Sequence, residues 1–295
     1  MQLNHGLHLA YCTNIHRGES WAQTFGTLQQ YTLAVRDRVS KGKPYAIGLR
    51  LGVDAARELS DAQTLTEFRR WLDRENCYVF TINGFPYGKF HGTRVKEQVY
   101  QPDWTTDERV DYTNLLFDLL AQIVPEGIEG SVSTVPGSYK EFITRQEQVQ
   151  AMRDNVWRTV EHIARLSQRT GRKLHLGLEP EPLCFLETSS ETAMFLDQLR
   201  EEHPGDSRLR EHLALDPSVD GRRIALYGVS RLGKAALWAG ANDPRFAAVV
   251  AVSSGEGGAA LSKRNYGETI GHVAAAFPYW FSPRWNSYAP SPASM

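Results

Sequence analysis

One serine, Ser230, lies in a turn whose residue types directly suggest a reaction. An apolar run at 224–229 leads into GVSRLG, and a helix-like segment follows. A serine on a tight strand-to-helix turn is pushed out of the sheet, and the helix N-terminus offers N–H donors to a developing oxyanion. The turn therefore predicts a hydrolase nucleophile, with Leu232 in place of the usual second glycine. An ordinary turn with Ser230 as the helix N-cap is the alternative interpretation.

A second set of chemically capable residues follows the strand-like runs in the first two thirds of the chain. Glu179 directly follows one such run, and His16 and His91 lie in loops after two others. Carboxylate and imidazole groups are common ligands of divalent metal ions. Because function in a parallel barrel lies at the C-terminal strand ends, these three residues are the predicted metal ligands. Arg50 and Asn83, at two further strand ends, are predicted to bind substrate.

Structural roles are the alternative for several of these residues. A single glutamate at a strand end also serves as the partner of a helix N-terminus or of an arginine. His8 and His175 lie within strand patterns, and we expect them to be hydrogen-bonded core or rim residues rather than ligands.

Strands and helices alternate along the chain, which predicts parallel strands joined by helical crossovers. The strands are predicted at Leu7–Thr13, Tyr45–Leu51, Cys77–Asn83, Gly130–Val135 and Lys173–Leu178. The helices are predicted at Ser20–Ser40, Asp54–Asn76, Thr106–Ile123, Tyr139–Thr170 and Ser189–His203. Two more strands, Arg223–Val229 and Phe246–Val252, follow a polar, proline-bearing stretch at 201–220. Residues 289–295 are expected to form a frayed tail.

Composition excludes some classes of function. The 295 residues carry a formal net charge of −1, so the chain has no electrostatic drive toward nucleic acid or anionic membranes. No run reaches the ~20 apolar residues of a membrane span. The first thirteen residues do not resemble a secretory signal. Cys12, Cys77 and Cys184 are too far apart for a CxxC metal site. We therefore expect a cytoplasmic protein.

Residues 3–212 resemble the metabolite traffic protein EboE family of the xylose isomerase-like TIM-barrel superfamily. The motifs that carry the resemblance are LHLAYCTNIHRGESW, GLRLG, FTINGFPYGKFHGTRVKEQVYQPDW, GSVSTVPGSYK and LGLEPEPLCFLE. The resemblance implies a barrel that handles a biosynthetic intermediate, and a divalent metal held through Glu179. Family members continue into a strand ending in Asp and His, whereas here Leu215-Asp216 is followed by Pro217-Ser218-Val219.

Residues 213–288 resemble part of the glucuronoyl esterases, which are α/β-hydrolases. ALDPSVDGRRIALYGVSRLGKAALW and the later FPYWF carry this resemblance. It implies that Ser230 is the nucleophile, that Arg231 helps to stabilise the oxyanion, and that Lys234 and Glu268 bind sugar hydroxyls. The family's catalytic histidine lies downstream of FPYWF, and His272 does not occupy its position.

The strand count suggests how the two parts could combine. Five strands, a short sixth at Leu213–Leu215 and the two later strands make eight, the number in a closed (β/α)8 barrel. We therefore predict an α/β, TIM-barrel-like fold whose last two β/α units come from the hydrolase-like fragment.

Three functions remain open. The first is an EboE-like barrel acting on a small phosphorylated or sugar-like metabolite, with a divalent metal as candidate cofactor. The second is a carboxylic ester hydrolase that uses Ser230. The third is a non-catalytic chimera.

Overall fold

The chain forms two units in the computed structural model, Met1–Ala214 and Leu215–Met295. The structure describes residues 1–3, 7–88, 97–213, 224–229, 236–237, 240–241 and 246–252, together with residues 271 and 275. The residues of the first unit are described almost throughout, and they contain the part of the fold that positions a site.

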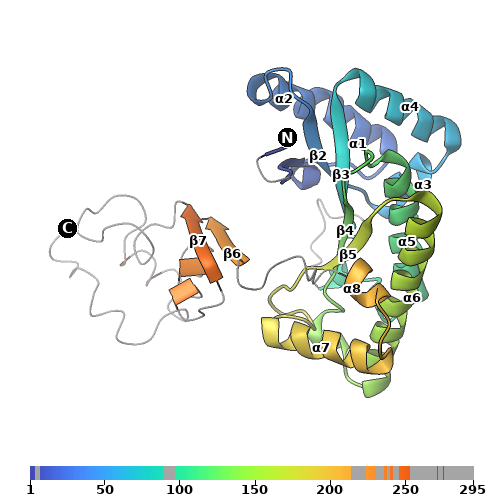
Figure 1. The fold of residues 1–295 in the computed structure, drawn as a ribbon, viewed down its shortest axis with the longest axis vertical. Coiled ribbons are helices and arrows are strands. Elements are labelled where there is room, and N and C mark those ends of the chain that lie inside the picture. The colour runs from blue at the N-terminus through green and yellow to red at the C-terminus, as the bar shows by residue number, and fades with distance from the viewer. Residues whose placement is uncertain are drawn as a thin grey trace. The chain divides into compact units, whose positions relative to one another are not determined.

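Unit 1 is built on a five-stranded parallel sheet in the order β1-β2-β3-β4-β5 (Figure 1). The strands are β1 (Ala10–Cys12), β2 (Tyr45–Arg50), β3 (Cys77–Asn83), β4 (Gly130–Thr134) and β5 (Leu174–Leu178). All five lie within the predicted runs, because buried parallel strands read as near-continuous apolar segments. The α/β prediction with a parallel sheet is confirmed for this unit.

Helices connect the strands in the predicted order, with two interruptions. They are α1 (Trp21–Thr27), α2 (Leu33–Val39), α3 (Val53–Leu59), α4 (Ala62–Arg74), α5 (Asp107–Ile123), α6 (Gln146–Thr170), α7 (Ser189–Glu202) and α8 (Arg208–His212). A π-helical turn, η3 (Leu28–Thr32), separates α1 from α2. Asp61 caps α4 and separates it from α3, because its side chain accepts from the Thr64 N–H. Gly171 ends α6 in the left-handed region at φ 69°.

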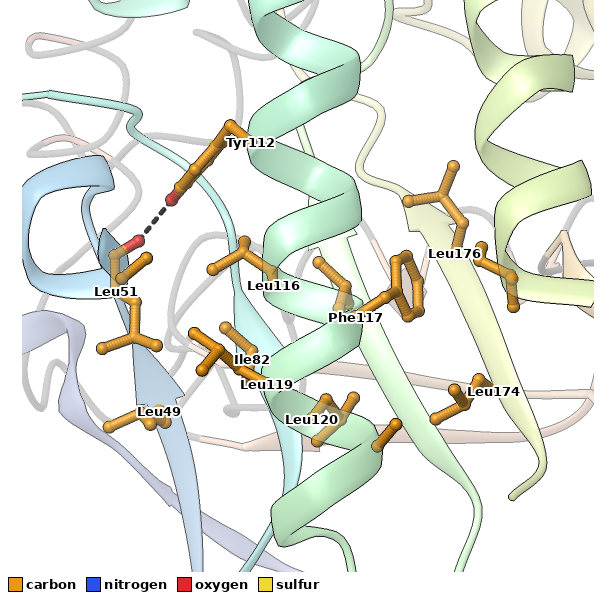
Figure 2. Packing of buried hydrophobic residues seen from close by; sticks show 14 of the residues in the cluster. Leu49, Leu51, Ile82, Tyr112, Leu116, Phe117, Leu119, Leu120, Leu174 and Leu176 are labelled. Atoms are coloured by element: carbon orange, nitrogen blue, oxygen red, sulfur yellow. Dashed lines mark hydrogen bonds between the residues drawn. The ribbon is translucent and has the colours of Figure 1, made fainter. Parts of the chain in front are cut away.

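The core of unit 1 lies between the sheet and helices α4, α5 and α6. Figure 2 shows leucines of α5 facing side chains of β2, β3 and β5. Leu116 and Leu120 on α5, Ile82 on β3 and Leu176 on β5 are fully buried. On β4 the buried residues alternate with half-buried Ser131 and Ser133, as the two-residue period of a strand requires. The second face of the sheet therefore carries small polar groups at β4.

Unit 1 ends where α8 and the next residue pack on β5. The imidazole Nδ1 of His212 lies 2.9 Å from the Leu174 carbonyl oxygen. Leu213 then forms a single parallel bridge with Leu176. This bridge occupies the position predicted for a short sixth strand at Leu213–Leu215, of which only Leu213 is described.

Strands β6 (Ile224–Val229) and β7 (Phe246–Val252) of unit 2 form a separate two-stranded parallel sheet. That they supply the last two units of an eight-stranded barrel stays a prediction. Their residues pair from Ile224↔Phe246 to Val229↔Val252, with a shift of register between Ile224 and Ala225. The number of strands had suggested closure, but strand number does not specify which edges pair. The predicted frayed tail at 289–295 lies outside the described residues.

Candidate functional site

Polar residues and aromatic rings gather in the loops that follow β3, β4 and β5. The carboxyl ends of these parallel strands meet at one edge of the sheet, where α/β folds bind ligands.

The loop after β3 is fixed by its first residues. Asn83 is half-buried, and its Oδ1 accepts from the Phe85 N–H at 2.8 Å. The Gly84 N–H donates to the Ser133 carbonyl at 2.8 Å. A Cβ at Gly84 would lie 2.7 Å from Leu116 Cδ1, so only glycine allows this approach to α5. Asn83 thus shapes the loop, while its predicted role in substrate binding stays a prediction.

The loop after β5 brings two carboxylates to the same edge. Glu179 is half-buried, and its N–H donates to the Thr134 carbonyl at 3.2 Å. Glu181 is also half-buried, and its N–H donates to the Leu186 carbonyl at 3.3 Å. Glu179 therefore occupies the strand-end position predicted for it. Burial, followed by the charge of Glu179, raises the pKa of Glu181 above its ordinary value.

A stack of three aromatic rings lies beside these carboxylates. Phe85 stacks on Tyr100 with centroids 5.4 Å apart, and Tyr100 stacks on Tyr139 at 5.6 Å. The Tyr100 hydroxyl lies 3.4 Å from Glu181 Oε2 and also interacts with the Cys184 thiol. Burial raises the pKa of Tyr100, and burial raises the pKa of Cys184 to about 11. At neutral pH, Tyr100 is therefore a hydroxyl donor and Cys184 is an uncharged thiol.

The segment that carries Tyr100 is tied to the loop after β4. Asp103 is buried, and its Oδ2 accepts from the Ser138 hydroxyl at 2.5 Å. The Trp104 indole N–H donates to the Val135 carbonyl at 3.0 Å. These contacts hold the aromatic stack against the sheet edge.

His16 lies after β1, as expected from the sequence, but its surroundings differ from those of a metal ligand. Its Nε2 is 2.8 Å from the Tyr11 hydroxyl. Its ring stacks on Tyr31 with centroids 4.8 Å apart. Burial lowers the pKa of His16, so the neutral imidazole is favoured. One ring nitrogen of His16 is therefore already engaged by a hydroxyl.

The described residues do not fit a divalent-metal site. Within the described part of the chain, no three His, Cys, Asp or Glu side chains converge as metal ligands. Tight binding needs several ligands in fixed geometry, and Glu179 with a tyrosine-bonded His16 does not supply them. His91, the third predicted ligand, lies outside the described residues. We derive no reaction step through a metal.

Arg50 ends β2 as a buried cation, with 5% of its surface exposed. Its Nη1 donates to the Gly18 carbonyl at 3.0 Å and its Nη2 to the Gly88 carbonyl at 3.1 Å. Its own N–H donates to the Thr13 hydroxyl at 2.8 Å. Arg50 thus joins the loops after β1 and β3.

Arg109 on α5 is a second buried cation, and the sequence analysis missed it. It is fully buried, with Nε 2.7 Å from the Pro102 carbonyl oxygen and Nη1 3.0 Å from that of Gly84. Its guanidinium carbon lies 5.8 Å from the Tyr87 ring centroid and 5.5 Å from that of Tyr112. Burial lowers the pKa of Arg109 to about 10. The signal was available, because Arg109 shares the apolar face of α5 with Tyr112, Leu116 and Leu120.

The other predicted site residues cannot be placed. Ser230, Arg231, Lys234 and Glu268 all lie outside the described residues. The strand before Ser230 is present as β6, and it ends at Val229 as the sequence predicted. The roles of these four residues, Ser230, Arg231, Lys234 and Glu268, stay predictions from the resemblance.

Comparisons with known proteins give sequence matches to the C-terminal part of the chain. The family model "Glucuronyl esterase, fungi" matches residues 205–295. A carbohydrate esterase from an unknown prokaryotic organism is 45% identical over 84 residues, which cover 28% of this chain and 19% of that protein. A 4-O-methyl-glucuronoyl methylesterase of Podospora anserina is 35% identical over 94 residues, covering 28% of this chain and 20% of that protein. The chain spans about a fifth of the length of these relatives.

Two solved structures show weaker likeness. The IolI protein, crystallised with a zinc atom, gives a TM-score of 0.37 at 13% identity, covering 67% of this chain and 58% of that one. The 3-keto-D-glucoside 4-epimerase YcjR from E. coli gives 0.38 at 12% identity, covering 84% and 92%. Neither score is high enough to support an argument.

The family match begins before the boundary between the units. Residues 205–213 lie in unit 1, where Leu209 and His212 are buried. The Arg208 guanidinium carbon lies 4.7 Å from the Trp157 ring centroid of α6. The first residues of the esterase-like segment are therefore part of the packing of unit 1. Among the described residues, no helix is both long enough and apolar enough to cross a membrane.

Proposed function

We propose that unit 1 binds a small sugar-like metabolite at the C-terminal ends of β3, β4 and β5. The contact between Tyr100 and Glu181, beside Glu179 and the aromatic stack, is the observation that carries this proposal. Carboxylates and a tyrosine hydroxyl match the hydroxyl groups of a sugar, and aromatic rings match its C–H faces. The resemblance to the EboE family, which implies handling of a biosynthetic intermediate, agrees with this ligand class.

A saturation-transfer NMR screen tests the proposal. The full chain is mixed with a panel of neutral monosaccharides and disaccharides. We expect saturation of aromatic protons to reach the ring hydrogens of at least one sugar. If no sugar in the panel receives saturation at millimolar concentration, the proposal of a sugar-like ligand fails.

We propose a second function, carboxylic ester hydrolysis through Ser230, on the strength of the family match over residues 205–295. Arg231 would stabilise the oxyanion, while Lys234 and Glu268 would bind the sugar part of the ester. A fluorophosphonate probe tests this directly, since it reacts with activated serines. Labelling that Ser230→Ala abolishes would support it. The absence of labelling at high probe concentration would leave a non-catalytic unit 2, the chimera considered from the sequence.

A further inference from the structure

We propose that the C-terminal ends of β2 and β3 bind an anionic group of the ligand, a phosphate or a carboxylate, through Arg50. This inference rests on the proposed function, to which it adds the charge of the ligand. It divides the sheet edge into a cationic part at β2 and β3 and a carboxylate-bearing part at β5.

Arg50 forms no ion pair with an acidic residue among the described residues. Its side chain donates to the backbone carbonyls of Gly18 and Gly88, and no Asp or Glu pairs with it among the described residues. The undescribed residues of unit 1 up to 213, at 4–6 and 89–96, contain no Asp or Glu either. No carboxylate of residues 1–213 therefore forms an ion pair with this buried guanidinium.

A second buried guanidinium without an ion pair among the described residues, that of Arg109, acts on the same hydroxyl as Arg50. Arg109 also binds only carbonyls, and its Nη2 is buried without a hydrogen-bond partner among the described residues. Both arginines act electrostatically on the Tyr112 hydroxyl, which donates to the Leu51 carbonyl (Figure 2). Buried charges are normally paired. The buried Asp103 carboxylate acts electrostatically on Arg109 and offsets part of its charge. The remaining positive charge of the two guanidinium groups favours an anion.

Of the two arginines, Arg50 is the one placed to contact a ligand. Arg109 is fully enclosed between Tyr87 and Tyr112, so it supplies charge but cannot reach a ligand. Arg50 lies at the end of β2, between the loops after β1 and β3. A guanidinium has five N–H donors, of which Arg50 uses two. The planar arrangement of the others suits the oxygen atoms of a phosphate or carboxylate.

The test is a titration of the full chain with inorganic phosphate and, separately, with acetate, at constant ionic strength kept with sodium chloride. Thermal unfolding reports binding, since a ligand of the folded state raises Tm with saturation. We compare wild type, Arg50→Gln, Arg50→Lys and Arg57→Gln, in which an exposed arginine of α3 is the matched control. A non-specific effect of phosphate on stability would be equal in all four.

We expect saturable stabilisation of wild type and Arg57→Gln by phosphate or acetate, with at least tenfold weaker binding in Arg50→Gln. The anion that saturates identifies the group. If Arg50→Gln does not fold, Arg50→Lys decides, because it keeps the charge but loses the planar donors and should bind several-fold more weakly. Equal binding by the Arg50 variants and wild type, or no saturation by either anion, would overturn the inference. Neutral sugar binding that depends on Glu179 would still stand in that case, so the two proposals fail separately.

Discussion

The Tyr100 hydroxyl lies 3.4 Å from Glu181 Oε2, a contact between residues 81 positions apart in the chain. It joins the segment before α5 to the loop after β5. Both partners belong to the strand-end region where Glu179 also lies. The contact therefore links the aromatic stack and the carboxylates into one candidate site.

Replacement of Glu181 by Gln should change how stability depends on pH. Burial and the charge of Glu179 raise the pKa of Glu181 above its ordinary value of 4.5. The folded state therefore holds this proton more tightly than the unfolded state does. The resulting stabilisation is complete below about pH 4.5 and is lost as pH rises through the raised pKa. The Tm of Glu181→Gln minus that of wild type should therefore be more positive at pH 7 than at pH 4.

Thermal unfolding at the two pH values checks this prediction. Glu201→Gln, a change at an exposed glutamate of α7, is the control and should show no such pH-dependent difference. A Glu181→Gln variant that parallels wild type across the range would show that the carboxyl group is as well solvated as in the unfolded chain.

Replacement of Gly84 by Ala should destabilise the site loop. The new Cβ would lie 2.7 Å from Leu116 Cδ1 and 3.0 Å from the Ser133 carbonyl oxygen. We expect a loss of about 1–3 kcal/mol in the free energy of unfolding, measured by urea denaturation. Gly88→Ala is the matched control in the same loop, because nothing lies within 4 Å of its added Cβ. It should stay within about 0.5 kcal/mol of wild type. Equal effects would refute the steric explanation.

Replacement of Arg109 by Ala should be among the more damaging changes in unit 1. It leaves a cavity and removes the donors to the Pro102 and Gly84 carbonyls. We expect a loss of about 3–5 kcal/mol in urea denaturation. Arg57→Ala, at an exposed position, should cost about 0.5 kcal/mol or less. A loss below 1 kcal/mol for Arg109→Ala would mean that the loop after β3 does not depend on the contacts of Arg109 with the Pro102 and Gly84 carbonyls.

Replacement of His212 by Ala should affect unit 1 although it lies within the esterase-like match. His212 is buried, and its imidazole contacts the Leu174 carbonyl. Loss of that partner should cost about 1–3 kcal/mol. Calorimetry of the full chain should show the transition of unit 1 shifted downward, with any transition of unit 2 unchanged. A shift confined to a different transition would place His212 outside the packing of unit 1.

The sequence predicted the strands of unit 1 closely and the site only in part. Apolar runs located β2 to β5 to within one residue at each end. The region 20–40 was predicted as one helix, because a π-helical turn keeps the helical pattern of apolar residues. Glu179 was found because it follows an apolar run. Tyr100 was not singled out, since its segment has no periodicity and is fixed by contacts distant in sequence.

Barrel closure is less predictable from a sequence than strand position, for a physical reason. Strand types can be read from composition, whereas pairing depends on which edges meet in space. Leu213 adds only one bridge to β5, and β6 pairs with β7. His8, expected to be a hydrogen-bonded core or rim residue, has its Nδ1 2.8 Å from the Tyr78 hydroxyl.

A calorimetric titration tests most directly whether the end of β5 binds the ligand. It uses the sugar that gives the strongest saturation-transfer signal. The full chain, Glu179→Gln and the Glu201→Gln control are compared at pH 7, with Tm measured for each. We expect Glu179→Gln to bind the sugar at least tenfold more weakly than wild type. The control should bind it with wild-type affinity, and both variants should keep the wild-type fold. Equal affinity in all three proteins would contradict the proposal that the end of β5 binds the ligand.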